Sequence, residues 1–419
     1  MSLADDILQI GQRAREASRS LARCDTDTKN SILQSIADGL EKNFHLLVSE
    51  NKKDLEAGEK RGLSKAMLDR LRLDEKRVSS MAVGLREVAS LPDPTGEVLS
   101  SWTQPNGIRI EKVRTPIGVI GIIYESRPNV TSDATGLCLK TGNAVILRGG
   151  SEAIHSNLAI AKIIQESGAT AGLPDHAVQL IPTTDREAVS LMAKMDAYID
   201  LIIPRGGHAL IERVVSEARM PVIKHYHGVC NIHVDTAADL EMATSIVVNS
   251  KCQRPGVCNA LENLTIDASI AKTFLPKIAA ALEKNSVELR GDDRALPLLG
   301  SKATTATEED WTTEYLDLIL SIKVVDSLDE AIAFINQYGS HHSDGIVTRE
   351  EAAAEKFLQE VDSATVYWNA STRFTDGNQF GFGAEIGIST DKLHARGPMA
   401  LPELTSYKYR IIGTGQIRE

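Results

Sequence analysis

The chain has 419 residues, of which 42% are hydrophobic, 25% are charged and 4% are aromatic, and its formal net charge is −11. This length exceeds what one hydrophobic core normally serves, so we expect two or three domains. The negative charge and the few aromatic rings argue against a general affinity for nucleic acid or for anionic membranes.

Residues 1 to 90 predict helices, because apolar side chains recur there with a period of three to four. Two alternating segments follow, 98–103 and 108–113, on either side of Asn106-Gly107. An Asn-Gly pair between alternating segments predicts a β-hairpin, since both residues accept a positive φ. A two-stranded hairpin is marginal alone, so we expect it to rest on another domain or subunit.

From residue 117 onward, apolar runs alternate with helical stretches. Such spacing indicates βαβ units and a largely parallel, doubly wound sheet. A second region in which strand and helix patterns alternate extends from residue 230 to residue 390. In the tail, residues 406–412 alternate between apolar and polar like a strand that can pair with the hairpin. The predicted strands are 117–123, 144–147, 178–181 and 199–203 in the first region, and 318–325, 345–348 and 365–368 in the second.

The five cysteines are odd in number and include no Cys-x-x-Cys pair. This pattern supports neither a disulfide framework nor a zinc site, so we expect no metal. Asp5 and Asp6 stand among the first apolar residues, which does not fit a signal peptide. No apolar run approaches the ~20 residues that cross a bilayer. We therefore expect a cytoplasmic protein with reduced thiols and no membrane partner.

Cys258 is the strongest candidate for a catalytic residue. It ends a polar loop bearing Lys251 and Arg254, and we expect this loop to join an apolar strand at 245–248 to another at 264–266. A thiol in a cationic loop can ionise, and only a thiolate attacks an acyl carbon. Because a cysteine alone is more often a small buried side chain, the assignment depends on the other motifs.

Asn129 follows the first strand of the α/β region, in the segment Tyr-Glu-Ser-Arg-Pro-Asn at 124–129. At the carboxyl end of a strand, its amide can point into the cleft where α/β proteins bind ligands. Together with the backbone N–H of a nucleophile it would form an oxyanion hole, worth ~3 kcal/mol per donor. The alternative is an Asx turn before Val130.

Two transitions from a strand through a glycine pair to a helix point to nucleotide binding. In residues 143–152 a strand leads into Gly149-Gly150 and then Ser151, which we expect to cap the next helix. Residues 202–208 repeat the pattern. A phosphate or ribose can approach the backbone N–H groups at such helix starts. A plain tight turn explains either one, but two successive examples favour a dinucleotide, although Gly-x-Gly-x-x-Gly is absent.

Several cationic side chains lie in polar, motif-like loops: Arg127, Arg254, Arg373 and Arg396, with His394 beside the last. Most arginines are solvated surface charges, so none of them is decisive alone. Arginines that converge would suit a phosphate, which accepts paired donors. We therefore keep all five as candidate substrate-binding residues.

Taken together, these segments resemble the aldehyde dehydrogenase superfamily, and within it the reductases that act on γ-glutamyl phosphate in proline biosynthesis. Four motifs carry the resemblance, which covers nearly the whole chain: residues 124–129, 253–260 (Gln-Arg-Pro-Gly-Val-Cys-Asn-Ala), 367–374 (Tyr-Trp-Asn-Ala-Ser-Thr-Arg-Phe) and 381–398. It implies an α/β fold with two doubly wound domains and a small β oligomerisation element.

The resemblance also implies roles for single residues. Cys258 falls on the nucleophile and Asn129 on the oxyanion amide. Arg148 stands where the superfamily has a lysine that reaches the adenosine ribose or its phosphate, and Glu314 resembles the carboxylate that holds the nicotinamide ribose. The residues implied to bind the cofactor are Arg148, Gly149, Gly150, Ser151, Glu152, Pro204, Arg205, Gly206, Gly207 and Glu314.

The implied domains are a dinucleotide-binding domain of residues 1–96 and 117–228, a catalytic domain of residues 229–400, and an oligomerisation element of residues 97–116 and 401–419. A homo-oligomer follows. The implied activity is the reduction of L-glutamyl 5-phosphate to L-glutamate 5-semialdehyde by NADPH, with release of phosphate. The resemblance leaves open whether a glutamate 5-kinase partner hands over this unstable substrate.

One departure from the superfamily bears on the reaction. Hydrolytic members carry a glutamate base in a Glu-Leu-Gly-Gly type segment, but the corresponding residues 223–228 (Ile-Lys-His-Tyr-His-Gly) contain no acid. Because such a base would hydrolyse a thioester, its absence favours an acyl phosphate reductase. The alternatives are NAD(P)-dependent oxidation of a semialdehyde to its acid, and a catalytically silent binding scaffold of the same fold.

Overall fold

The computed structural model describes residues 2–224 and 226–418, which form two compact units. Within these residues, unit 1 comprises 2–224, 381–387 and 399–418, and unit 2 comprises 226–380 and 388–398. We expected the second domain to run without interruption from 229 to 400. Segment 381–387 lies with unit 1 instead, because Ile386 and Gly387 exchange backbone hydrogen bonds of 2.9 and 2.7 Å with Met399.

The predicted helices occupy the first 90 residues. They are α1 (Leu3–Leu21), α2 (Thr26–Lys42), α3 (Phe44–Lys60), α4 (Lys65–Leu71) and α5 (Glu75–Ser90). Four of them begin directly after a side chain that accepts a hydrogen bond from the first turn: Ser2, Asp25, Ser64 and Asp74. Since these caps satisfy backbone N–H groups that lack a helical partner, local sequence determines where the helices begin.

Unit 1 is built on a parallel four-stranded sheet of order β5-β4-β3-β6. Helices α1, α8 and α9 pack on one face, and α6 and α7, backed by α2 and α5, cover the other. Strands β3 and β4 are buried throughout, which explains their unbroken apolar runs. The elements are β3 (Val119–Tyr124), α6 (Val130–Lys140), β4 (Ala144–Arg148), a 3-10 turn (Ser151–Ala153), α7 (Ile154–Thr170), β5 (Val178–Leu180), α8 (Glu187–Ala193), β6 (Leu201–Arg205) and α9 (His208–Glu217).

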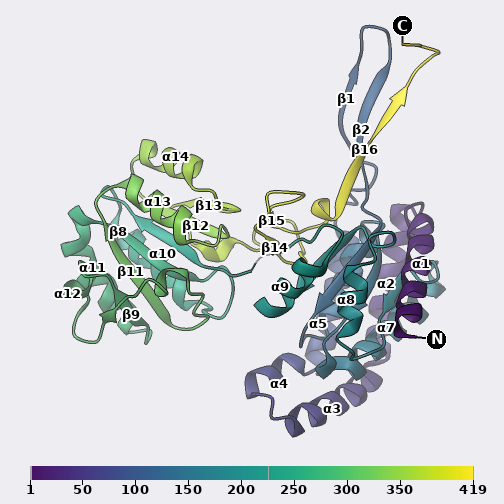
Figure 1. The fold of residues 1–419 in the computed structure, drawn as a ribbon, viewed down its shortest axis with the longest axis horizontal. Coiled ribbons are helices and arrows are strands. Elements are labelled where there is room, and N and C mark those ends of the chain that lie inside the picture. The colour runs from purple at the N-terminus through teal and green to yellow at the C-terminus, as the bar shows by residue number, and fades with distance from the viewer. Residues whose placement is uncertain (1, 225, 419) are drawn as a thin grey trace. The chain divides into compact units, whose positions relative to one another are not determined.

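A three-stranded antiparallel arm projects from unit 1 (Figure 1). It consists of β1 (Val98–Thr103), β2 (Arg109–Pro116) and β16 (Thr405–Ile412), in the order β1-β2-β16. Gly107 in the connecting turn has φ of +87°, which a glycine adopts without strain. The arm confirms both the predicted hairpin and the predicted pairing with the tail.

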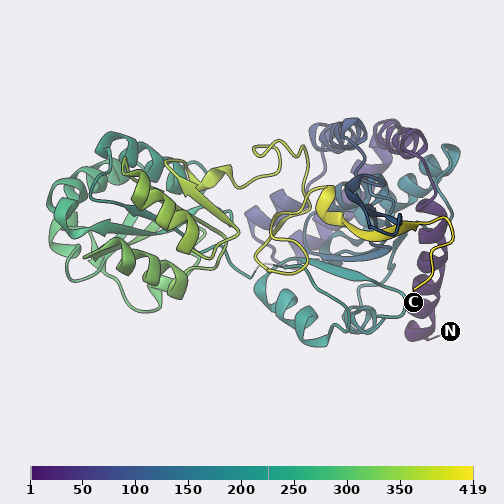
Figure 2. The same ribbon diagram turned by 90° about the horizontal axis from the view of Figure 1, so that it is seen from above.

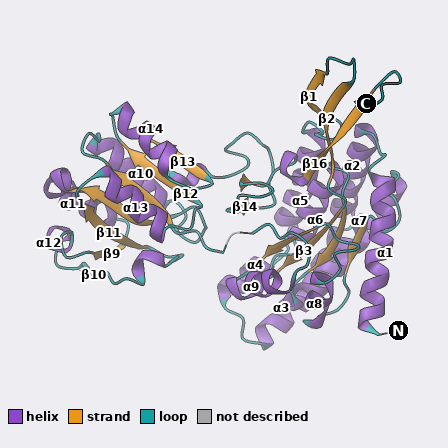
Figure 3. Cartoon of the chain, turned by 45° about the horizontal axis from the view of Figure 1, so that its top comes forward, coloured by secondary structure: helices purple, strands orange, loops and turns teal. Residues whose placement is uncertain are grey.

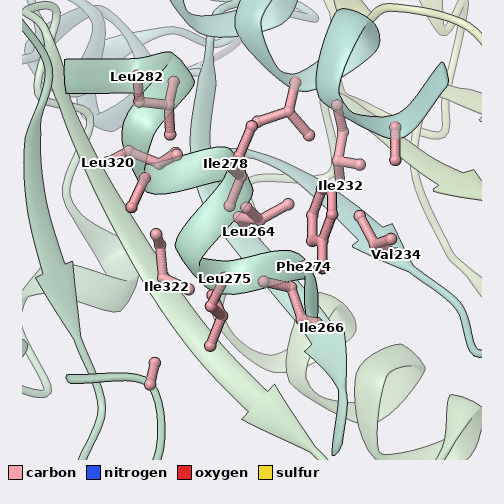
Figure 4. Packing of buried hydrophobic residues seen from close by; sticks show 14 of the residues in the cluster. Ile232, Val234, Leu264, Ile266, Phe274, Leu275, Ile278, Leu282, Leu320 and Ile322 are labelled. Carbon is pink, nitrogen blue, oxygen red and sulfur yellow. The ribbon is translucent and has the colours of Figure 1, made fainter. Parts of the chain in front are cut away.

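Unit 2 contains a parallel seven-stranded sheet of order β10-β9-β11-β8-β7-β12-β13, with helices on both sides (Figures 2 and 3). On one side Phe274 and Ile278 of α11 pack against Leu264 and Ile322 (Figure 4). Helices α13 and α14 cover the other side. The elements are β7 (Cys230–Val234), α10 (Leu240–Cys252), β8 (Leu261–Asp267), α11 (Ala268–Glu283), β9 (Glu288–Gly291), α12 (Leu296–Leu299), β10 (Thr304–Thr305), β11 (Ile319–Val325), α13 (Leu328–Tyr338), β12 (Ser343–Val347), α14 (Glu351–Glu360) and β13 (Thr365–Trp368).

Short elements complete the chain. They are 3-10 turns at Asp310–Thr312, Thr372–Phe374 and Pro402–Leu404, and a two-stranded ladder of β14 (Ile388–Ser389) and β15 (Gly397–Pro398). All seven strands predicted from apolar runs are present, and so is the strand predicted around 264–266. The two doubly wound sheets confirm the predicted fold class.

Two local predictions are wrong. Segment 245–248 is not a strand but part of α10, because Asp239 caps that helix and Ala243 and Val247 face the core at helical spacing. Tertiary burial here overrides the strand preference of the β-branched residues. Ser151 does not cap a helix either. The carboxylate of buried Asp54, far away in the sequence, accepts hydrogen bonds of 3.1 and 2.8 Å from the first turn of α7.

Candidate active site

The residues predicted in unit 1 gather at one edge of its sheet. Because β4, β3 and β6 are parallel neighbours, the loops after them open on the same side. Arg127 and Asn129 follow β3. Residues 148–152 span the end of β4 and the loop after it, and residues 204–207 span the end of β6 and the loop after it. The tertiary structure therefore brings together three segments that the sequence keeps far apart.

Asn129 lies at the start of α6, and its amide nitrogen donates a 2.7 Å hydrogen bond to the carboxylate of Asp133 one turn later. Its side chain does not cap the helix, so the alternative of an Asx turn is wrong. A side-chain amide has two N–H groups, and Asp133 takes one of them. Asp133 thereby restricts the orientation of the amide.

Arg148 is almost fully buried at the end of β4. Its guanidinium donates to the backbone carbonyls of Gly149, Thr184 and Asp185 at 3.0, 3.3 and 3.2 Å. Burial lowers the pKa of this guanidinium, and the neighbouring Glu152 partly opposes the effect. Arg148 therefore brings a positive charge to the sheet edge and ties the loop after β4 to the loop after β5.

The glycines at this edge leave room for the ends of the chain's own polar side chains. A Cβ atom at Gly149 would lie 2.1 Å from Asn157, and one at Gly150 would lie 2.3 Å from the Glu152 carboxylate. A Cβ atom at Gly206 would lie 2.5 Å from the carboxylate of Glu125. Larger side chains at these three positions would collide with groups already present.

Two carboxylates organise the same loops. Glu152 accepts hydrogen bonds of 2.5 and 2.7 Å from the backbone N–H and the hydroxyl of Ser126. Glu125 accepts a 2.8 Å hydrogen bond from the N–H of Gly207 at the start of α9. The sequence reasoning missed Glu125 and Ser126, although both lie inside the motif 124–129, because no linear signal shows that they reach other loops.

In unit 2 the backbone of Cys258 is held from several sides. Cys258 is a half-buried residue, and its carbonyl oxygen accepts a 3.2 Å hydrogen bond from the buried thiol of Cys230 at the start of β7. A Cβ atom at Gly228 would lie 1.8 Å from the same carbonyl oxygen. The next residue, Asn259, donates to the carbonyl of Thr375 at 2.9 Å. These contacts hold the backbone of the loop on both sides of Cys258.

Cationic side chains lie in and against the loop that carries Cys258. Arg373 donates a 2.9 Å hydrogen bond to Gln253, in the loop that carries Cys258. Burial and the neighbouring Arg254 lower the pKa of Arg373, whereas Cys258 raises it. Arg254 lies in the same loop, four residues before Cys258. Cationic neighbours of this kind favour the thiolate form of a cysteine.

Lys251 does not contribute to that loop, contrary to the prediction. It lies in the last turn of α10, where its ammonium group pairs with Glu262 of β8 at 2.6 Å. Both side chains are fully buried. Burial lowers the pKa of Lys251 and raises that of Glu262 to about 8. The cationic character around Cys258 therefore comes from Arg254 and Arg373.

Glu314 approaches the cysteine loop from the segment before β11. Its carboxylate accepts a 3.0 Å hydrogen bond from the N–H of Gly228, and burial raises its pKa. Gly228 belongs to the segment 223–228, which corresponds to the Glu-Leu-Gly-Gly segment of the hydrolytic members. Within this segment, His225 lies outside the described residues. Glu314 nevertheless brings a carboxylate to Gly228 from a distant part of the chain, which no local motif could reveal.

Arg396 and His394 occupy a different environment within unit 2. Arg396 donates to a carboxylate oxygen of Asp362 at 2.8 Å and to its carbonyl at 2.9 Å, and Lys392 pairs with the same carboxylate at 2.5 Å. These two cations lower the pKa of Asp362 to about 2. His394 is exposed. Asp362 therefore already engages the Arg396 guanidinium. Binding of the substrate by Arg396 and His394 stays a prediction.

The five cysteines are free thiols. Over residues 2–224 and 226–418, the structure contains no group of three or more His, Cys, Asp or Glu side chains that could hold a metal ion. In the same part of the chain, every helix is too short or too polar to cross a membrane.

Comparison with known proteins decides the family. The model of the aldehyde dehydrogenase family matches residues 2–298 and 304–389. The chain belongs to the aldehyde dehydrogenase family. The γ-glutamyl phosphate reductases of Moorella thermoacetica and Geobacter metallireducens are 56% and 57% identical to it over 419 residues, which is 100% of either chain. The crystal structure of γ-glutamyl phosphate reductase from Thermotoga maritima is 47% identical and has a TM-score of 0.97, covering 99% of this chain and 100% of that one.

Membership of the aldehyde dehydrogenase family confirms the resemblance predicted from the motifs, and it implies an enzyme that binds NAD(P). Unit 1 offers a suitable edge, with parallel strand ends, a helix start at α9 and the Arg148 guanidinium. The side chains at this edge of the unit 1 sheet therefore fit a dinucleotide.

Gly228→Ala tests whether the packing around Cys258 matters for activity. Because the new Cβ would lie 1.8 Å from the Cys258 carbonyl oxygen, the loop must move. We expect turnover to fall by ~10²-fold, the loss that a misplaced reactive group commonly causes. Alkylation of Cys258, followed by mass spectrometry, should slow or become heterogeneous. Gly84→Ala is the matched control, since nothing lies within 4 Å of its Cβ position, and it should keep full activity. Wild-type turnover in Gly228→Ala would contradict the account.

Proposed function

We propose that this chain reduces L-glutamyl 5-phosphate to L-glutamate 5-semialdehyde with NADPH and releases inorganic phosphate. The observation that carries the proposal is the fixed, cation-flanked loop of Cys258, whose thiol is partly exposed while its backbone is packed against Gly228. The full-length relatives at 56% and 57% identity bear the name of this activity and support the choice of substrate.

The first step is acylation of Cys258. The thiolate attacks the γ-acyl carbon, the bond from that carbon to the phosphate oxygen breaks, and phosphate leaves as a thioester forms. Phosphate is a good leaving group, so the protein must stabilise negative charge more than it must donate a proton. Arg254 and Arg373 provide two such charges in the same unit. Arg127, His394 and Arg396 are the other proposed ligands of the phosphate and the α-carboxylate.

The oxyanion of the tetrahedral intermediate needs preorganised donors. We assign the amide of Asn129 and the backbone N–H of Cys258 to this role, each donor being worth ~3 kcal/mol. The hydrogen bond from Asn129 to Asp133 and the hydrogen bond from Cys230 to the Cys258 carbonyl restrict these two donors before substrate arrives. Preorganisation of this kind avoids rearrangement during the reaction.

Cofactor binding is assigned to the edge of the unit 1 sheet and to Glu314. The proposed ligands are Arg148, Gly149, Gly150, Ser151, Glu152, Pro204, Arg205, Gly206, Gly207 and Glu314. When bound, the nicotinamide supplies the hydride that reduces the thioester, after which the thiohemiacetal of Cys258 collapses to the semialdehyde. The choice of NADPH over NADH rests on the positive charge of Arg148 at this edge, which suits a 2′-phosphate.

The arm points to self-association. Three apolar residues lie side by side across its strands, because Ile110 of β2 pairs with both Trp102 of β1 and Ile411 of β16. Tyr409 lies on the same face, and its ring centroid is 6.2 Å from that of Trp102. Trp102, Tyr409 and Ile411 are exposed. An exposed apolar sheet face of this kind is suited to a protein partner, and we assign it to a second copy of the chain, giving a homo-oligomer.

The proposed compartment is the cytoplasm, where thiols such as Cys258 stay reduced. The substrate is an acyl phosphate, so an enzyme that phosphorylates the side chain of glutamate must supply it. A glutamate 5-kinase is the proposed partner in this sense. No role in binding nucleic acid or membranes is proposed for a chain with a net charge of −11.

Cys258→Ala should abolish turnover, because no other group can form the thioester. The assay runs in reverse, with semialdehyde and NADP⁺, and follows NADPH absorbance with and without phosphate. Wild-type protein should require phosphate. Cys252→Ala, at a partly exposed thiol of the same segment, is the control and should keep activity. Phosphate-independent formation of glutamate would favour oxidation to the acid, and activity in Cys258→Ala would defeat the mechanism.

Arg148→Ala should reduce kcat/KM for NADPH more than for NADH, by about tenfold, because a cation that meets the 2′-phosphate acts on only one of the two cofactors. Steady-state kinetics with both cofactors measures the difference. Arg15→Ala, which removes a 2.7 Å ion pair with Asp200 in the same unit, should leave the ratio unchanged. Equal losses for both cofactors would exclude the 2′-phosphate contact.

Charges on the exposed face of the arm should disrupt the oligomer. The double variant Trp102→Glu/Ile411→Glu places two carboxylates where we expect an apolar contact, so its sedimentation coefficient should fall toward that of a monomer. Leu358→Glu, at an exposed leucine of α14, is the control and should sediment like wild type. An unchanged coefficient for the double variant would show that the arm does not hold the subunits together.

A further inference from the structure

A fully buried ion pair closes the base of the loop that carries Cys258. Lys251 ends α10 on one side of that loop, and Glu262 lies in β8 on the other. Their charged atoms are 2.6 Å apart, and both side chains have an exposed fraction of 0%. Because desolvating two charges is expensive, apolar residues of the same size would hold the fold at least as well. Packing alone therefore does not account for the pair.

The same pair also meets the turn that presents Glu314. The second carboxylate oxygen of Glu262 accepts a 3.4 Å hydrogen bond from the N–H of Leu316, which has a left-handed φ of +54°. The ammonium group of Lys251 lies 5.9 Å from the centre of the Tyr315 ring. A left-handed leucine is a strained conformation, so it persists only where neighbouring contacts hold it. Glu262 supplies one of those contacts.

This turn leads directly back to the nucleophile. Glu314 accepts a 3.0 Å hydrogen bond from the N–H of Gly228, and Gly228 packs against the carbonyl of Cys258. The chain of contacts from Lys251 and Glu262 therefore reaches Cys258 by two routes. One route runs along the backbone of the 253–260 loop, and the other runs through Leu316, Glu314 and Gly228.

We propose that Lys251 and Glu262 are positioning residues, which set the Cys258 loop and the Glu314 carboxylate in one arrangement. They need touch neither substrate nor cofactor. The inference rests on the proposed function, because it takes Cys258 as the nucleophile and Glu314 as a ligand of the cofactor ribose. An ion pair suits this task better than apolar packing, since its two hydrogen-bonding ends specify direction as well as distance.

Replacing the pair by apolar side chains separates positioning from stability. Lys251→Met/Glu262→Leu fills the same space without charge and without the acceptor for Leu316. We expect this full-length variant to fold, to lose about 10- to 100-fold in kcat/KM for NADPH, and to show an altered rate of Cys258 alkylation. Thermal unfolding, NADPH fluorescence titration and alkylation followed by mass spectrometry measure the three effects.

A milder variant keeps the test decisive if the apolar pair folds poorly. Lys251→Met/Glu262→Gln retains the volume and an amide oxygen that can accept from Leu316. It should recover most of the affinity for NADPH, because the turn of Glu314 keeps its support. The matched control is Lys29→Met/Asp93→Leu, which removes the buried 2.6 Å ion pair of unit 1. This control should change the thermal stability but neither kcat/KM for NADPH nor the rate of Cys258 alkylation.

The outcomes of the two proposals can be told apart. If Cys258→Ala keeps turnover, the proposed function fails whatever the ion-pair variants do. If Cys258→Ala is inactive while Lys251→Met/Glu262→Leu keeps the wild-type affinity for NADPH and the wild-type alkylation rate, the positioning role is overturned. Equal kinetic losses in the Lys29→Met/Asp93→Leu control would overturn it as well, because the effect would then be general destabilisation.

Discussion

The close contact between Gly228 and the backbone of Cys258 is the constraint on which the cysteine loop of unit 2 depends. Strands β7 and β8 are adjacent in the sheet. Gly228 precedes β7 and Cys258 precedes β8, so the two backbones run close together as they enter the sheet. Only a residue without a Cβ allows the two backbones to approach this closely. Once they do, the carbonyl of Cys258 is held in place by Gly228 and by the thiol of Cys230.

Charged side chains meet the Cys258 loop from two sides. Arg254 lies in the loop itself, and Arg373 donates a 2.9 Å hydrogen bond to Gln253 of the same loop. At the base of the loop, Lys251 and Glu262 form an ion pair at 2.6 Å, and both side chains have an exposed fraction of 0%. Two buried charges are tolerated there because each is paired with the other.

The edge of the unit 1 sheet illustrates how one motif can serve two purposes. The glycines at 149, 150 and 206 admit the side chains of Asn157, Glu152 and Glu125, which tie neighbouring loops together. A glycine-rich strand end is often taken as a sign of bound phosphate. Here the same glycines also allow the chain's own loops to pack against one another.

Local signals such as caps, turns, apolar periods and short motifs were enough to predict the helices of residues 1–90, the hairpin with its tail strand, the strands of both parallel sheets and the family. They also singled out Cys258, and the roles of the site residues are predictions. Four features came from the folded chain alone: 245–248 is helical, Asp54 caps α7, Lys251 is buried against Glu262, and Glu314 reaches Gly228. Each of these depends on a partner distant in the chain, and the pairing of distant residues is set by how the sheets and helices pack rather than by any local pattern.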